Sequence, residues 1–212
     1  APGLDYEAMT NDILALMDRL GVERAHLIGH SLGGKLGMVL ADRHPERVAR
    51  LAVVDIAPKW YPPWHQDVFE ALDAVDLAAL ESREQARQQM AAHVFEPEVR
   101  AFLAANLEQV DGQWRWRFNL PELKAAYEQT SDMPLLSGFY LGPTLFIRGA
   151  QSAYIEAADE PQIGRDFPQS CIATLERARH WPHIEDTAGF LDAVTRFFAS
   201  GCEGFAPPRG EQ

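Results

Sequence analysis

The sequence predicts an α/β fold in which a mostly parallel sheet is flanked by helices. Three observations lead to this prediction. Helical and buried-strand patterns alternate over residues 1–58, they alternate again over 139–200, and a long helical pattern separates the two stretches. Such alternation implies right-handed crossovers and a parallel sheet. We therefore expect one α/β core with a helical insertion over 59–138 and a mobile tail over 201–212.

The first part of the chain predicts helix, strand, helix and strand, in that order. Apolar residues recur at steps of three and four over residues 6–20, which is the period of a helix. The apolar run over 25–29 predicts a buried strand, and the pattern after it predicts a helix that stops before Pro45. A second buried strand is predicted over 50–58.

The composition and periodicity of the sequence change after the second predicted strand. An aromatic and proline-rich break over 59–65 precedes a helical pattern over 66–130, which a turn with alternating aromatic residues interrupts. Strands are predicted again over 143–149 and 171–176, and an amphipathic helix over 186–199 closes the fold. The insertion is thus predicted to be a helical lobe.

Composition and charge restrict the possible partners. The chain has 212 residues, of which 47% are apolar, enough for a sizeable core. A formal net charge of -12 repels phosphate backbones and anionic membrane surfaces, so neither nucleic acid nor a membrane is expected as a partner. No segment approaches the ~20 apolar residues of a membrane span, and the N-terminal residues lack the features of a signal peptide.

The two cysteines, Cys171 and Cys202, lie far apart in the sequence. Their number and spacing fit neither a disulfide framework nor a zinc site. We therefore expect two reduced thiols and a cytoplasmic protein.

The segment GHSLGG, residues 29–34, matches the pattern G-x-S-x-G with Ser31 at its centre. A nucleophilic serine on a sharp strand-to-helix turn has a strained backbone, and small residues such as Gly29 and Gly33 let strand and helix approach closely. Both the strand and the helix are predicted here. Ser31 is therefore predicted to be a nucleophile, with the backbone N–H of Leu32 as an oxyanion donor near the positive end of the helix dipole.

A serine hydroxyl needs a base to take its proton, and the sequence offers seven histidines. His180 and His183 follow the last predicted strand and precede the last helix, where α/β-hydrolases carry the catalytic histidine. His180 is favoured because it comes first after the strand, and a structural hydrogen-bonding role is expected for His183. His30, inside the serine turn, is expected to point away from Ser31 and to pack or to support the oxyanion site.

The acid that orients the base has two candidates. The loop after the penultimate strand is the common place for it, but Gln151 and Ser152 stand there. Asp55 ends a buried strand, where an unpaired charge is costly. We therefore favour Asp55 as the acid, with Asp159 second.

Three segments resemble a known family: the one around GHSLGG that ends in DIAP, the segment PTLFIRGAQSAYI, and HWPHIED. They resemble small bacterial esterases of the α/β-hydrolase fold, a group close to the mitochondrial abhydrolase esterases. The resemblance covers nearly all of residues 4–199 and implies that the insertion is a cap. It further implies hydrolysis of short-chain esters, in some members of acyl-CoA thioesters, with no metal and no organic cofactor. By position it places the nucleophile at Ser31, the base at His180 and the acid at Asp55.

The sequence departs from the family pattern in two ways. Arg179 replaces the glycine that usually precedes the catalytic histidine, and Pro182 lies two residues after that histidine. Family members also carry a further N-terminal segment with the first strands of the sheet and a His-Gly loop, which supplies a second oxyanion N–H. Nothing in this sequence matches that segment. The sequence is therefore expected to be an N-terminally incomplete esterase that is poorly folded or inactive by itself.

The expected substrate is a small-molecule ester or thioester with a short to medium acyl chain, cleaved through an acyl-enzyme. Aromatic residues near the predicted site either line an acyl pocket or pack the cap: Trp60, Tyr61, Trp64 and Trp181, with Phe95, Trp114 and Trp116 in the cap. Other cofactor-free chemistry of the same fold, such as C–C hydrolysis or haloperoxidase-like oxidation, is one alternative. A non-catalytic interaction protein on this scaffold is the other. The oligomeric state is not predicted.

Overall fold

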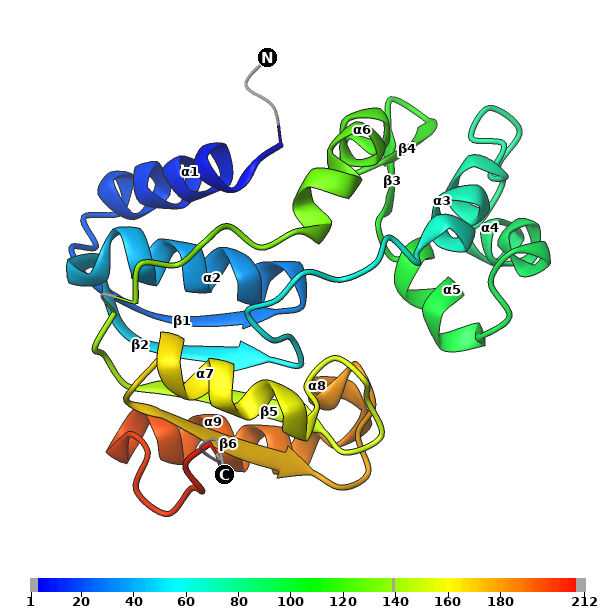
Figure 1. Cartoon of the computed structure of the whole chain (residues 1–212). Helices are drawn as coiled ribbons and strands as arrows, with labels where there is room; N and C mark the ends of the chain where they lie inside the picture. Colours follow the sequence, from blue (N-terminus) through cyan, green and yellow to red (C-terminus); the bar gives the residue numbers. More distant parts are fainter. Residues whose placement is uncertain (1–3, 139, 209–212) are drawn as a thin grey trace. The chain divides into compact units, whose positions relative to one another are not determined.

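The computed structural model describes residues 4–138 and 140–208, and these residues divide into two compact units (Figure 1). The α/β unit consists of Asp5–Trp60 and the residues from Asp132 onward. The helical unit is formed by Tyr61–Ser131. The insertion predicted from the sequence, 59–138, contains this range.

A four-stranded parallel sheet forms the centre of the α/β unit. Its strands are β1 (Ala25–His30), β2 (Val48–Val54), β5 (Thr144–Gly149) and β6 (Ser170–Leu175), in the spatial order β1-β2-β5-β6. Each neighbouring pair is parallel. This confirms the predicted α/β fold with a parallel sheet.

The helices of the α/β unit precede, connect or follow the strands (Figure 1): α1 (Tyr6–Arg19), α2 (Leu32–Arg43), α7 (Glu160–Asp166), α8 (Pro182–Glu185) and α9 (Thr187–Ser200), with the short 3₁₀ turns η1 (Pro45–Arg47) and η3 (Ala157–Asp159). Among the helices of the described residues, none has the length and apolar character that spanning a bilayer requires.

The two faces of the sheet are covered by different helices. On β2, Ala52 and Val54 belong to one apolar cluster with Phe197 of α9. The alternate residues Leu51 and Val53 lie against glycines of α2. Because successive side chains of a strand point to opposite faces, α2 and α9 cover opposite faces of the sheet (Figure 1).

Strand β1 is less buried than the sequence predicts. Ile28 is 52% exposed and His26 is exposed as well. Within residues 4–138 and 140–208, β1 pairs with β2 alone, so it lies at an edge of the sheet. The prediction of a buried strand therefore holds for Gly29 but not for His26 and Ile28 among the described residues. Apolar composition does not indicate whether a second strand lies beside β1.

The opposite edge, β6, is covered by the segment that follows α9. Cys171 of β6 forms a disulfide with Cys202. The Ile172 N–H donates a hydrogen bond to the Ala206 carbonyl at 2.8 Å. The guanidinium of Arg196 lies over the ring of Phe205 at 4.5 Å. These contacts fix the start of the C-terminal segment against an edge strand whose backbone groups need partners.

Two predictions are therefore corrected at this edge. The cysteines are not reduced thiols, because the fold brings together two positions that are 31 residues apart. The cytoplasmic location inferred from reduced thiols loses its basis. Through Ala206 the predicted mobile tail is instead bonded to β6, and its last four positions, 209–212, lie outside the described residues.

The helical unit contains four α-helices and a hairpin: α3 (Gln66–Asp73), α4 (Arg83–Gln89), α5 (Pro97–Ala104), α6 (Leu120–Ser131), β3 (Leu107–Val110) and β4 (Gln113–Trp116), with the 3₁₀ turn η2 (Met90–Ala92). The two strands are antiparallel. Asp111 and Gly112 between them have φ values of 51° and 78°, which is the backbone of a two-residue hairpin turn. Buried residues such as Phe69, Met90 and Leu103 give this unit a core of its own.

The disulfide should stabilise the α/β unit. Reducing it, or changing Cys202→Ser, should lower the free energy of unfolding by about 2–4 kcal/mol, because the unfolded chain is then no longer constrained. Urea unfolding with and without reductant measures the difference. The Cys202→Ser variant, which cannot form this bond, should not respond to reductant. Equal stability of the oxidised and reduced protein would contradict the expectation.

Candidate active site

The ends of all four parallel strands contribute to one site. Ser31 follows β1, Asp55 follows β2, Ser152 lies shortly after β5, and His180 lies in the loop after β6. Since the carboxyl ends of parallel strands meet at the same edge of a sheet, these side chains converge although they are distant in sequence. The site described here lies within the α/β unit.

Three of these side chains form a continuous path of hydrogen bonds. Nε2 of His180 lies 3.2 Å from Oγ of Ser31, and Nδ1 of His180 lies 3.0 Å from Oδ2 of Asp55. A carboxylate only accepts, so Nδ1 carries the proton and Nε2 is left to accept from the serine hydroxyl. The structure thus brings together the three residues selected from the sequence.

The backbone of Ser31 has the geometry of a sharp turn. Its φ is 53° and its ψ is -121°, a conformation that non-glycine residues rarely adopt. Its N–H donates to the Val54 carbonyl of β2 at 3.0 Å, which fixes the turn to the sheet. Leu32 opens α2, so its N–H belongs to the first turn, where backbone amides have no acceptor within the helix.

The glycines around Ser31 serve different purposes. A Cβ atom on Gly29 would lie 2.2 Å from the Gly33 carbonyl oxygen, and one on Gly34 would lie 2.6 Å from the side chain of Ile56. A Cβ on Gly33 would meet nothing within 4 Å. Close approach of strand and helix therefore requires glycine at positions 29 and 34. The prediction that Gly33 also allows this close approach is wrong. The motif gives the spacing of the glycines but not the direction in which each Cα faces.

The carboxylate of Asp55 is fully buried, with 0% exposure. Oδ1 accepts the Gly149 N–H at 3.0 Å, and Oδ2 accepts a short hydrogen bond from the Ser152 hydroxyl in addition to the one from His180. Its φ of 50° is also in the left-handed region. Three donors thus compensate the burial of this negative charge, which would otherwise be costly.

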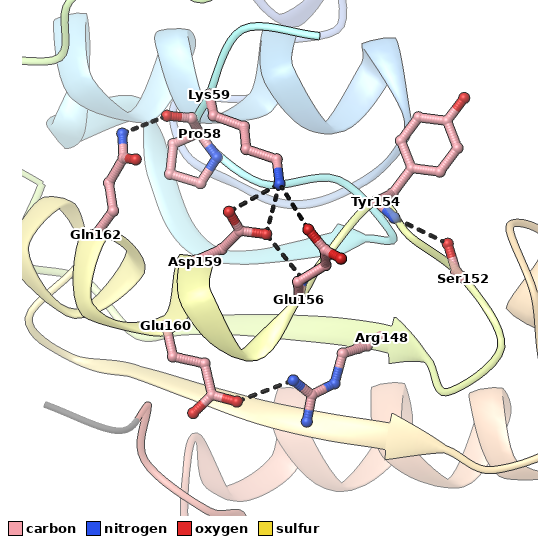
Figure 2. A network of polar contacts seen from close by, with 9 residues as sticks. All are labelled: Pro58, Lys59, Arg148, Ser152, Tyr154, Glu156, Asp159, Glu160 and Gln162. Carbon is pink, nitrogen blue, oxygen red and sulfur yellow. Dashed lines mark hydrogen bonds and ion pairs between the residues drawn. The ribbon is translucent and has the colours of Figure 1, made fainter.

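Ser152 and Tyr154 belong to the site but were not selected as site residues from the sequence. The ring of Tyr154 stacks on that of His180, with centroids 3.8 Å apart and planes 18° apart. The Tyr154 N–H donates to Oγ of Ser152 at 3.2 Å (Figure 2). Ser152 stands where the acid of such enzymes is commonly found, but that position by itself does not indicate a hydrogen bond to Asp55.

Asp159, the second candidate for the acid, has a different partner. Nζ of Lys59 lies 2.8 Å and 2.7 Å from its two carboxylate oxygens, and the Glu156 N–H donates to it at 2.8 Å (Figure 2). The Gln162 amide also donates to the Pro58 carbonyl at 2.6 Å. Asp159 therefore secures the loop that follows Asp55, and it is Asp55 that contacts His180.

Two further histidines lie beside His180. Nε2 of His30 is 2.6 Å from the His180 carbonyl oxygen, and the ring of His183 is 4.9 Å from that of His30. Burial, together with the neighbouring His180 and His183, lowers the pKa of His30 from 6.5 to about 4, although the hydrogen bond to the His180 backbone and the charge of Asp55 raise it. Burial also lowers the pKa of His183.

The aromatic candidates for an acyl pocket are divided between the two units. Trp60 is exposed and Trp181 is partly buried in the α/β unit. In the helical unit Tyr61 is buried, Trp64 and Phe95 are exposed, and Trp114 and Trp116 pack against the core of that unit. Packing therefore accounts for the last two, and substrate contact by the others stays a prediction. Among the described residues, no group of three or more His, Cys, Asp or Glu is placed to hold a metal ion.

A parallel sheet with a serine on the strand-to-helix turn and a histidine after the last strand defines the class of protein: an α/β hydrolase. The chain belongs to the alpha/beta hydrolase fold family, whose model matches residues 2–187. Within that family its relatives include enzymes named as esterases and lipases.

The chain is 39% identical over 205 residues to the mouse sn-1-specific diacylglycerol lipase ABHD11. The aligned region covers 94% of this chain and 67% of the mouse protein. It is 32% identical over 197 residues to the esterase YbfF of Escherichia coli, covering 92% and 76%. The solved structure of a marine microorganism esterase matches with a TM-score of 0.88 at 28% identity, covering 93% and 78%. Across four ABHD11 proteins, the chain spans 64% to 67% of their length.

The two glycines of the G-x-S-x-G pattern should respond differently to substitution. Gly29→Ala should lower the free energy of unfolding by about 1–3 kcal/mol or more, because its Cβ overlaps backbone atoms that cannot move away easily. Gly33→Ala, the matched control, should leave stability unchanged or raise it by up to about 1 kcal/mol, since alanine favours helix. Chemical denaturation of both variants measures this. Equal effects would contradict the assignment.

His30 should make stability depend on pH. Its pKa is lowered on folding, from 6.5 to about 4, so its contribution is complete above pH 6.5 and is lost as the pH falls through 4. Between pH 7 and pH 5 this group should lower the free energy of unfolding by on the order of 1–2 kcal/mol. The side chain of the His30→Gln variant cannot titrate, so its free energy of unfolding should fall less between pH 7 and pH 5. Urea unfolding at the two pH values measures both decreases. The same decrease in both proteins would count against a neutral, partly buried His30.

Proposed function

We propose that this protein is a serine hydrolase that cleaves carboxylic esters through an acyl-enzyme. Ser31 is the nucleophile, His180 the base and Asp55 the acid that orients it. The observation that carries the proposal is the path of two hydrogen bonds, 3.2 Å and 3.0 Å long, from the serine to the buried carboxylate. The names of the relatives, esterases and a diacylglycerol lipase, support the same reaction class.

In the first half of the reaction, Oγ of Ser31 attacks the ester carbonyl and its proton passes to Nε2 of His180. The positive charge on the imidazole is stabilised by Asp55 through the Nδ1–H hydrogen bond. The carbonyl oxygen becomes an oxyanion, which accepts a hydrogen bond from the Leu32 N–H at the positive end of α2. The C–O bond to the alcohol then breaks, and His180 returns the proton to the departing oxygen.

In the second half, water replaces the alcohol. His180 takes a proton from a water molecule, whose oxygen attacks the carbonyl carbon of the acyl-serine. The bond between that carbon and Oγ of Ser31 breaks, and the proton on His180 returns to Oγ. A carboxylic acid is released and the enzyme regains its initial protonation.

Asp55 suits the role of the orienting acid because its own position is fixed. Its Oδ1 accepts the Gly149 N–H, and its Oδ2 accepts both the Ser152 hydroxyl and the Nδ1–H of His180. A carboxylate held by three donors holds the imidazole in one tautomer and one orientation. The buried environment also strengthens its attraction to the imidazolium that forms during the reaction.

The substrate is a small-molecule ester with a short to medium acyl chain. An acyl thioester would follow the same steps, with the proton of His180 passing to the departing sulfur so that a thiol is released. A pair of substrates that differ only in the oxygen or sulfur of the leaving group separates the two preferences. The named relatives favour the oxygen ester.

Ser31→Ala should abolish hydrolysis of a chromogenic short-chain ester by the intact protein, with a loss of about 10⁴-fold or more in kcat. Labelling by a fluorophosphonate probe should disappear as well. Asp55→Asn should lower kcat by about 10⁴-fold, because it favours the wrong tautomer of His180.

Asp159→Asn is the matched control for Asp55→Asn. It removes the other candidate acid, whose partner is Lys59, and leaves the hydrogen-bond path to Ser31 intact. Turnover by this variant should stay within about tenfold of wild type. Full turnover by Ser31→Ala, or equal losses in the two aspartate variants, would refute the assignment.

A further inference from the structure

His30 connects two strand ends that are not neighbours in the sheet. It is the last residue of β1, and its Nε2 lies 2.6 Å from the carbonyl oxygen of His180, 150 positions later. A carbonyl only accepts, so Nε2 carries a proton and donates it. β1 and β6 are the two outer strands in the order β1-β2-β5-β6. This hydrogen bond therefore spans the sheet and joins the loop of the proposed base to the turn of the proposed nucleophile.

The backbone of His180 needs such a connection because it lies in irregular structure. The residues between the end of β6 at Leu175 and the start of α8 at Pro182 form turns and bends. The Arg179 and Trp181 N–H groups both donate to the Glu185 carboxylate, which holds the loop to α8. The Gln151 N–H donates to the Ala178 carbonyl at 3.0 Å, which holds the start of the loop to the segment after β5. At His180 itself, the bond from His30 holds the main-chain carbonyl to the end of β1.

We propose that His30 is a positioning residue, which holds the backbone of His180 so that its imidazole stays within hydrogen-bond reach of Ser31. The inference rests on the proposed function and adds a residue to it. The distance from Nε2 of His180 to Oγ of Ser31 is 3.2 Å, so a small displacement of the loop would break the contact. The side-chain bond to Asp55 orients the imidazole ring, whereas the bond from His30 fixes the chain that carries the ring.

The surroundings explain why a neutral donor suits this position. The ring of His30 lies 4.7 Å from that of His180 and 4.9 Å from that of His183. His180 becomes positively charged during ester cleavage, and a second cation at that distance would oppose it. Burial keeps His30 neutral, with a pKa of about 4, while its Nε2–H still donates. His30 thus holds the loop without adding a positive charge.

Two amide variants separate positioning from general packing. The nitrogen of glutamine can replace Nε2 of a histidine, whereas asparagine is one methylene shorter and cannot reach the His180 carbonyl. His30→Asn should lower kcat by about 10- to 100-fold with KM changed less than about twofold, because a misplaced catalytic group costs about that much. His30→Gln should recover most of the loss. His26→Asn, at an exposed position of the same strand, should leave kcat unchanged.

A second readout does not depend on turnover. The Nδ1–H of His180, hydrogen-bonded to Asp55, should give a low-field proton resonance in NMR spectra. The resonance should be retained in His30→Gln and lost or shifted in His30→Asn, at equal secondary-structure content. Retained kcat and resonance in His30→Asn, or equal losses in both variants, would overturn the proposal.

The two proposals fail in different ways. An intact protein that neither hydrolyses esters nor reacts with a fluorophosphonate at Ser31 would refute the proposed function. The His180 resonance in the two variants would then still decide whether His30 positions the loop.

Discussion

The buried carboxylate of Asp55 is the constraint on which the rest of the structure depends. It has 0% exposure and accepts hydrogen bonds from Gly149, the last residue of β5, from Ser152 in the loop after β5, and from His180 in the loop after β6. A charge in such a place is tolerated only when its partners are in position. The parallel order of the strands brings those partners to one edge of the sheet. The interactions that compensate the buried charge are therefore the same ones that align the proposed catalytic groups.

The main residues of the candidate site were predictable from the sequence because each stands at a recognisable place in the strand order. Ser31 lies in a motif between a strand and a helix, and His180 follows the last strand. Asp55 could be selected because a charge at the end of a buried strand requires a partner. Ser152 and Tyr154 could not be selected in this way, because their roles depend on the path of an irregular loop. Their sequence positions indicate neither a hydrogen bond to Asp55 nor a ring stacked on His180.

The errors of the sequence-based predictions concern contacts between distant segments. Cys171 and Cys202 have an uninformative spacing, and only the packing of the segment after α9 against β6 brings them together. The exposure of Ile28 likewise depends on which strands lie beside β1. For Gly33 the error is local, since the motif does not indicate which glycine faces the neighbouring backbone. Periodicity and motifs describe an element, whereas these features depend on its neighbours.

The placement of Asp55 after β2 has a consequence for the classification of hydrolases by alignment. An alignment of this family can look for the acid only at the positions that follow the penultimate strand, one column of the alignment. In this sequence Gln151 and Ser152 stand there, so such an alignment would classify the sequence as an inactive homologue. Yet β2 and β5 are neighbours, so a carboxylate at either strand end can reach the same imidazole nitrogen. Genome surveys that treat the two columns as equivalent would keep such sequences among the candidate enzymes.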